Sequence, residues 1–163
     1  MPKAFIILFV LTSPGLLAQE SLQLGGMTMS YTIVGQQLSV TLEAPTQGWL
    51  GIGFNDRNAI VGSDLLLMHV IDNKAEVLDM QVKGIGNPKE DQMLGGTNNI
   101  IITAYAEKAG RTTISFSRPL NTQDPNDYPI ERGKDLWLIL AYSTHDDFGH
   151  HSRMRKHTSF TFE

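Results

Sequence analysis

Short apolar segments that alternate every second residue dominate this chain, and turn-forming residues separate them. Residues 27–34 place Met29, Tyr31 and Ile33 on one side, and residues 38–42 alternate in the same way. A period of two is typical of a half-buried β-strand, and no segment beyond the first 18 residues has a convincing helical period. Comparable segments predict further strands at 49–54, 65–71, 75–82, 99–106, 112–116, 136–143 and 158–162. The sequence therefore predicts an all-β, antiparallel sandwich or barrel of roughly nine or more strands.

The first 18 residues have the pattern of an export signal. Lys3 precedes an apolar core at residues 4–11, and a small residue, Ala18, ends the segment before Gln19. The apolar core is too short to span a bilayer. We therefore predict a signal peptide at 1–18 and a single mature domain at 19–163, exported to the periplasm or to the cell exterior. A buried N-terminal strand is the alternative interpretation.

Composition excludes several classes of protein. Without residues 1–18, 12 Lys and Arg stand against 17 Asp and Glu, a formal charge of −5, whereas a nucleic-acid-binding protein needs a basic surface. The chain has no cysteine, which excludes disulfides, thiolate metal sites and covalently attached haem. An exported domain without disulfides fits a bacterial envelope protein. No second long apolar segment follows, so the mature domain is not expected to span a membrane.

The last quarter of the chain concentrates histidine. Four of the five histidines lie within thirteen residues of one another, directly after an apolar segment that reads as a buried strand. Imidazole is the commonest metal-binding side chain, and a loop that leaves a rigid sheet can hold a metal ion. The candidate metal ligands are His145, His150 and His151, with the neighbouring carboxylates of Asp146 and Asp147. The alternatives are a solvated histidine loop and an Asp pair that caps a turn.

Several motifs, taken together, resemble the DOMON family. They occur in order and with fitting spacing: Gly-Trp-x-x-x-Gly-Phe at 48–54, Gly-Ser-Asp at 62–64, Asp91 with 94–98, Ser-Arg-Pro-Leu at 117–120 followed by Asp124 and Asp127, and the strand 137–142 followed by a His. The resemblance covers about residues 28–162. It implies a β-sandwich of two packed sheets that acts outside the cytoplasm.

The resemblance also implies one of two kinds of ligand. DOMON members either bind b-type haem for electron transfer or are proposed to bind sugars, and the haem-binding members hold iron between a Met and a His. The His position is matched best by His151, with His150 one place away, and the Met position falls at Ile60. Isoleucine cannot bind iron. The remaining candidates for a second ligand are Met68, His69 and Met93, and the other alternative is a five-coordinate iron.

We expect a ligand-binding module and no enzyme. The chain has no Gly-x-Ser-x-Gly elbow, no His-Glu-x-x-His motif and no cysteine nucleophile. Haem b with His151 as axial ligand, in a pocket between the sheets near Ile60, implies electron transfer with a redox partner protein or a membrane cytochrome. Strand alternation places Met68 and His69 on opposite faces, so at most one of them points inward. The alternative is a haem-free module that binds a carbohydrate or another surface.

Two polar segments have both a binding and a structural interpretation. The segment 55–58, Asn-Asp-Arg-Asn, could supply oxygen ligands for calcium with Asp64, but it lacks the spacing of an EF-hand, so a polar loop is favoured. The basic segment 153–157 could bind an acidic redox partner or haem propionates. Charged residues on an edge strand that discourage aggregation are an equally good explanation.

Overall fold

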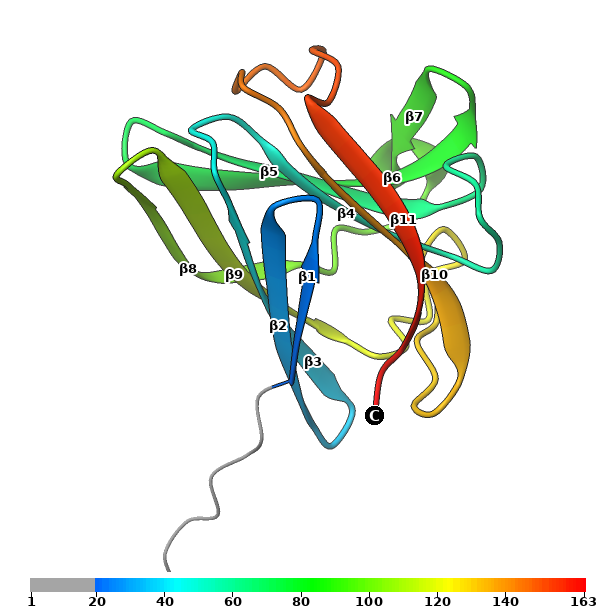
Figure 1. Ribbon diagram of the computed structural model, residues 1–163. Helices are drawn as coiled ribbons and strands as arrows, with labels where there is room; N and C mark the ends of the chain where they lie inside the picture. The colour runs from blue at the N-terminus through cyan, green and yellow to red at the C-terminus, as the bar shows by residue number, and fades with distance from the viewer. Residues whose placement is uncertain (1–19) are drawn as a thin grey trace, which may run out of the picture.

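The computed structural model describes residues 20–163, which form a sandwich of two antiparallel β-sheets (Figure 1). The predicted signal peptide at 1–18 lies outside the described residues and stays a prediction. The first sheet has five strands in the order β1-β2-β3-β9-β8. Their bounds are β1 Glu20–Leu24, β2 Met27–Val34, β3 Gln37–Ala44, β9 Arg111–Pro119 and β8 Ile101–Lys108.

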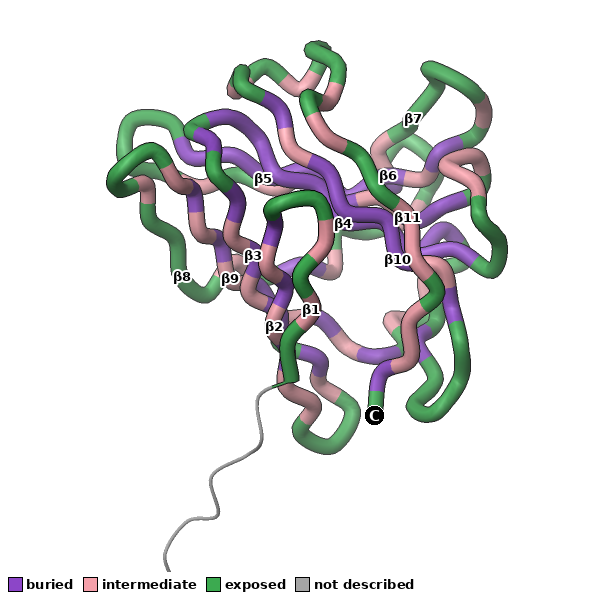
Figure 2. The backbone as a smooth tube through the Cα atoms, in the orientation of Figure 1, coloured by how far each residue is buried: buried purple, intermediate pink, exposed green. Residues whose placement is uncertain are grey.

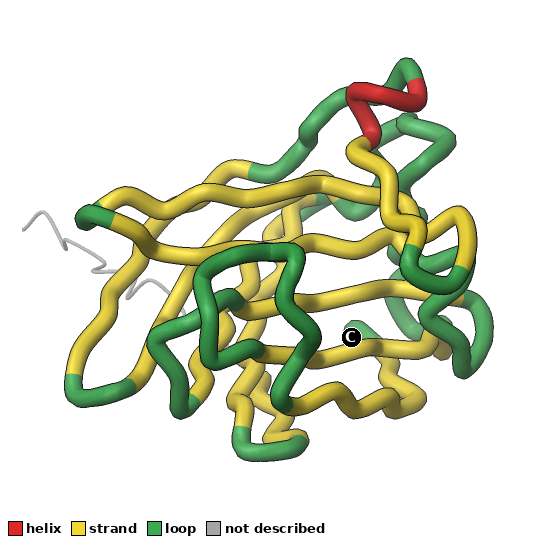
Figure 3. Tube along the Cα trace, turned by 90° about the horizontal axis from the view of Figure 1, so that it is seen from above, coloured by secondary structure: helices red, strands yellow, loops and turns green. Residues whose placement is uncertain are grey.

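The second sheet has six strands in the order β11-β10-β4-β5-β6-β7. Their bounds are β11 Met154–Thr161, β10 Asp135–Tyr142, β4 Leu50–Asn55, β5 Asp64–Ile71, β6 Lys74–Gly84 and β7 Asn87–Glu90. A single turn of 3₁₀-helix, η1 (Asp91–Leu94), follows β7 and stands at the margin of the molecule (Figure 3). The prediction of an all-β, two-sheet antiparallel sandwich is confirmed.

Alternation along the strands fills the space between the sheets. In β2 the side chains of Met27, Met29 and Tyr31 are buried, while the residues between them are half-exposed. The hairpin turns use the left-handed backbone that tight antiparallel connections need: Gly35 has φ 60° between β2 and β3, and Asp72 and Asn73 have φ 49° and 57° between β5 and β6. The buried positions of both sheets meet in one continuous core (Figure 2).

Strand β4 is buried on both faces, which explains its glycine pattern. Its inward side chains join the core, and its outward positions are Gly51 and Gly53. A Cβ atom on Gly51 would lie 2.9 Å from Cδ2 of Leu67 and 3.4 Å from Cζ3 of Trp49. These two side chains therefore cover the outer face of β4 only because glycine leaves them room. The Gly-Trp-x-x-x-Gly-Phe motif therefore serves the packing of side chains against β4.

The antiparallel register of β4 and β10 determines which loops share an end of the sandwich. Leu50, the first residue of β4, pairs with Tyr142, the last residue of β10. The loop 143–153, which holds three of the histidines, therefore lies at the start of β4, whereas the loop 56–63, which holds Ile60, follows the end of β4. These two loops lie at opposite ends of the six-stranded sheet.

Candidate metal centre

The most unusual polar residue of the fold is Arg118, which lies on β9 and is fully buried. Its Nη1 donates a hydrogen bond to Oδ2 of Asp64 at 2.7 Å, and its Nη2 donates to the carbonyl oxygen of Tyr128 at 3.2 Å. The guanidinium also lies over the ring of Phe54, with Cζ 5.4 Å from the ring centroid. A buried charge needs partners of this kind, because its removal from water is otherwise too costly.

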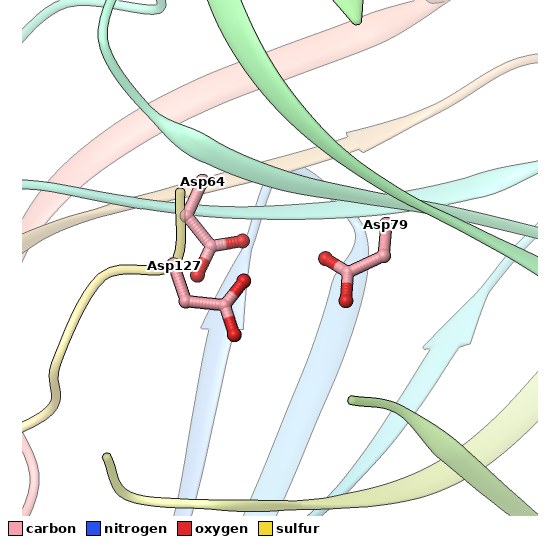
Figure 4. Close-up of side chains that lie close together, drawn as sticks. All are labelled: Asp64, Asp79 and Asp127. Carbon is pink, nitrogen blue, oxygen red and sulfur yellow. The ribbon is translucent and has the colours of Figure 1, made fainter. Parts of the chain in front are cut away.

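Three buried aspartates lie near this arginine, and a fourth, Asp91, interacts with them. Asp64 begins β5, Asp79 lies on β6 and Asp127 lies in the loop between β9 and β10; one carboxylate oxygen from each lies within 4.8 Å of the others. Figure 4 shows the three carboxyl groups facing one another. Asp91, at the start of η1, is 1% exposed. Four carboxyl groups and one guanidinium are therefore buried in this region of the domain.

The protein supplies too few donors for these carboxylates. The backbone N–H of Tyr128 donates a hydrogen bond to Oδ2 of Asp64 at 2.9 Å. The backbone N–H of Asn99 donates to Oδ2 of Asp79 at 3.1 Å. The Asn99 side-chain amide donates to Oδ2 of Asp127 at 3.2 Å. Five buried oxygens of these four aspartates receive no hydrogen bond from the described residues: Oδ1 of Asp64, of Asp79 and of Asp127, and both oxygens of Asp91. Buried carboxylate oxygens without a donor are rare in native proteins and call for a proton or a cation.

The pKa values of two aspartates in the cluster reflect its excess of negative charge. Burial and the charges of Asp64 and Asp127 raise the pKa of Asp79 to about 7. Burial, a hydrogen bond that protonated Asp91 shares with Asp127, and the charge of Asp79 raise the pKa of Asp91 to about 8. Burial alone would lower the pKa of Arg118. The charge of Asp64, the hydrogen bond to Asp64 and the charge of Asp127 outweigh this effect and hold the pKa of Arg118 above its ordinary value. Near neutral pH the cluster therefore holds protons that offset part of its negative charge.

Sequence reasoning found parts of this cluster without joining them. The Gly-Ser-Asp motif contains Asp64, and the Ser-Arg-Pro-Leu motif contains Arg118 and precedes Asp127, but nothing in the sequence shows that the two motifs meet. Asp79 was missed because a single acid in an alternating strand gives no signal. The favoured interpretation of the segment 55–58 agrees with the structure, since the side-chain amide of Asn55 donates to the carbonyl oxygens of Ala59 and Val61 within its own loop.

The predicted histidine ligands lie at the other end of the sandwich. His145 and His150 are exposed on the loop between β10 and β11, with their rings stacked at a centroid distance of 4.2 Å. His151 is also exposed. His157 lies on β11, with Nδ1 2.9 Å from the side-chain oxygen of Asn58. The structure thus brings His145 and His150 together.

The other predicted haem ligands are scattered. Met68 is fully buried in the core, while His69 lies on the outer face of the same strand, where Nδ1 is 2.8 Å from the carbonyl oxygen of Asp146. The prediction that Met68 and His69 point to opposite faces is confirmed. Met93 lies on η1 and is 72% exposed.

The expectation of one pocket between the sheets near both Ile60 and His151 is wrong, because the two loops lie at opposite ends of β4. The space between the sheets is filled by side chains without exposed surface, among them Leu50, Met68 and Phe116. The described residues therefore do not fit a haem held between two axial ligands. A sugar platform is not visible either: among the aromatic residues described, only Tyr105 is exposed, and its hydroxyl donates to the carbonyl oxygen of Asn73.

Comparison with known proteins places the fold and these motifs in a family. The family model of the DOMON domain matches residues 23–143. The chain belongs to the DOMON family. Over 117 residues it is 33% identical to the DBH-like monooxygenase protein 2 of Mus musculus, and over 115 residues 27% identical to the DBH-like monooxygenase protein 1 of Homo sapiens. Each match covers 71% of this chain and 18% of the relative, so the DOMON domain corresponds to less than a fifth of those proteins.

Solved structures confirm the DOMON fold. The cytochrome b domain of pyranose dehydrogenase from Coprinopsis cinerea aligns with a TM-score of 0.61 and 11% identity, covering 83% of this chain and 76% of that domain. The cytochrome domain of Myriococcum thermophilum cellobiose dehydrogenase aligns with a TM-score of 0.61 and 10% identity, covering 89% and 82%. At this identity the likeness concerns the fold. No helix among residues 20–163 is long and apolar enough to cross a membrane.

We predict that Arg118→Met lowers the free energy of unfolding by about 3–5 kcal/mol, because it leaves the Asp64 carboxylate buried without its cation. The matched control is Arg111→Met, since Arg111 pairs with Glu43 at the surface, where both side chains are 42% exposed. An exposed pair contributes about 1 kcal/mol or less. Urea unfolding of both variants at neutral pH measures the difference, and equal small losses would contradict the role given to Arg118.

Proposed function

We propose that this DOMON domain binds a divalent cation of the calcium class between Asp64, Asp79, Asp91 and Asp127. The observation that supports the proposal is the set of five buried carboxylate oxygens in this cluster that lack a donor. One carboxylate oxygen from each of Asp64, Asp79 and Asp127 lies within 4.8 Å of the others. Oxygen-only sites select hard cations, and calcium tolerates the irregular arrangements that loops and strands provide. Magnesium demands a regular octahedron and retains its waters, which a closely packed, buried site disfavours.

The chemistry of the site is an exchange of protons for a metal ion. Arg118 neutralises one carboxylate through Asp64. Protons on Asp79 and Asp91 neutralise two more, and a divalent ion would replace those two protons at constant charge. The ion would then connect β5, β6, η1 and the loop between β9 and β10, which are separate in the sequence. Its role is the ordering of this end of the domain, which acts by binding and not by catalysis.

We also propose that the chain is exported. The proposal rests on the pattern of residues 1–18, in which Lys3 precedes the apolar core 4–11 and Ala18 closes the segment. Extracellular calcium-binding modules work with dissociation constants of about 10⁻⁴–10⁻³ M. A site that holds two protons near neutral pH, and must lose them to the ion, fits such a weak affinity.

We predict that calcium stabilises the domain against heat. At a calcium concentration about 100 times the dissociation constant, binding contributes about 2.7 kcal/mol, which corresponds to a rise in Tm of roughly 5–10 °C for a domain of this size. Asp79→Asn, which imitates the protonated carboxyl group, should fold and lose most of this rise. Asp72→Asn removes a carboxylate from an exposed hairpin turn and should retain it. Calorimetry of the three proteins with EDTA and with calcium gives the answer; a Tm that calcium leaves unchanged would overturn the proposal.

A second prediction concerns pH. The pKa values of Asp79 and Asp91 rise from 3.8 to about 7 and about 8 on folding, so the folded chain binds more protons than the unfolded chain. This stabilisation is complete below about pH 4 and is lost as the pH rises to about 8. With EDTA, the urea midpoint should therefore fall between about pH 6 and about pH 9. Calcium should restore more stability at the higher pH, and Asp79→Asn should flatten the dependence. A midpoint that climbs with pH in EDTA would contradict the assignment.

Haem b with His151 as axial ligand, and electron transfer to a redox partner, is the competing proposal that the family suggests. The two cytochrome domains share the fold, but Ile60 and His151 lie at opposite ends of this one. We therefore expect the purified protein to be colourless after expression with haem supplementation and to form no Soret band with added hemin. A Soret band that disappears in His151→Ala would establish haem ligation and reverse this conclusion, whereas the calcium experiment would stand independently.

A further inference from the structure

Strand β11 forms the outer edge of the six-stranded sheet and carries a run of cationic side chains (Figure 1). It pairs with β10 alone, so its backbone groups on the other side have no partner strand among residues 20–163. Arg155 and Lys156 on the strand, and Arg153 directly before it, are exposed. None of the ion pairs among the described residues involves these three side chains. The edge thus combines unpaired backbone with positive charge that no carboxylate neutralises.

The other three edges of the described sheets are less suited to receive a further strand. β7 has four residues and contains Pro88, and β1 has five residues. β8 has eight residues, but its pairing with β9 shifts register between Ile102 and Ala104. Short strands, proline and bulges all discourage the addition of a strand. β11 pairs with β10 over eight consecutive residues without such a shift, so it is the one long and regular edge.

The charge on β11 acts differently on different partners. A second copy of β11 would bring like charges together, which is destabilising when they lie opposite each other on neighbouring strands. An acidic strand would meet opposite charges at the same positions, and such pairs are stabilising. The cations that discourage self-association therefore favour an acidic strand. The two interpretations of the segment 153–157, protection of an edge and binding of an acidic partner, are thus compatible.

The register of β11 defines the pattern that such a partner needs. Arg155 lies opposite Ala141 of β10, which belongs to the apolar cluster on the outer face of the sheet. Arg153 N–H donates to the carbonyl oxygen of Tyr142 at 2.8 Å, so the hydrogen bonding to β10 extends to Arg153. A partner strand therefore needs acidic side chains at every second position, opposite Arg153 and Arg155. Lys156 adds positive charge between them along the exposed edge.

We propose that β11 binds an extended acidic segment of a partner protein, which joins the six-stranded sheet as a seventh strand. Main-chain hydrogen bonds supply affinity in this mode of recognition, and charge complementarity selects the partner. A large polyanion or an anionic membrane fits less well, because the whole chain has a formal charge of −4 and its other acidic groups would repel such a surface. A short segment responds mainly to charges within about 10 Å, the screening length in about 0.1 M salt. The proposal does not depend on the calcium site.

Calorimetric titration of the full chain with an octapeptide, Glu-Val repeated four times with both ends blocked, tests the proposal. We expect binding that weakens between about 50 mM and about 200 mM salt. Arg155→Ala and Lys156→Ala should each weaken binding by about two- to five-fold, as the loss of an exposed ion pair does. Lys108→Ala is the matched control, because it removes an exposed lysine from β8 in the other sheet, and it should bind as the unchanged protein does. Thermal unfolding confirms that each variant is folded.

Two further measurements distinguish strand addition from simple attraction between charges. A second octapeptide, Glu-Pro repeated four times, keeps the same charges but cannot pair as a strand, because proline lacks the N–H group; it should lose most of the binding. The backbone amides of β11 should exchange more slowly with deuterium when the Glu-Val peptide is bound, while those of β8 stay unchanged. No binding of the Glu-Val peptide, equal binding of both peptides, or amides of β11 that gain no protection would each overturn the proposal. Protection of β11 by dimerisation without peptide would make a second copy the occupant and overturn it as well.

Discussion

The buried ion pair between Arg118 and Asp64 is the constraint around which the rest of this domain is arranged. Arg118 belongs to the five-stranded sheet and Asp64 to the six-stranded sheet, so their 2.7 Å contact joins the two layers through the core. A slip of either strand by one residue would turn a charged side chain toward the opposite face. The pair would then lose its partner, and an unpaired buried charge is far more costly than a displaced apolar side chain. The pairing of Arg118 with Asp64 thus requires the correct register of both strands.

The buried acidic cluster carries more negative than positive charge, and this excess has structural consequences. One guanidinium stands against four carboxyl groups, and the protein adds only three hydrogen bonds from Tyr128 and Asn99. A cluster built in this way is stable only with bound protons or a bound cation, so its composition couples the folding of the domain to its solution conditions.

The sequence predicted the layered fold well because alternation is a local property. Nine of the eleven strands overlap segments that the sequence predicted as strands, and the burial of Met27, Met29 and Tyr31 follows the period of two visible in their segment. β1 was missed because it directly follows the predicted export signal, and β7 because Pro88 and the nearby glycines indicated a loop. The acidic cluster was not predicted as a unit, since Asp64 and Asp127 are 63 residues apart and meet only through strand order. The prediction of a pocket near Ile60 and His151 was wrong for the same reason. A sequence motif shows which residues are present, but it does not show at which end of the sheet the loops that carry them lie.

Strand β5 begins at the acidic cluster and ends beside the histidine loop. Asp64 points inward at its start, and five residues later His69 points outward, a separation of about 17 Å along a rigid strand. The two polar sites of the domain therefore face different directions and share no side chain. The same strand fixes the distance between the acidic cluster and the histidine loop, so β5 is a spacer of constant length as well as part of the core.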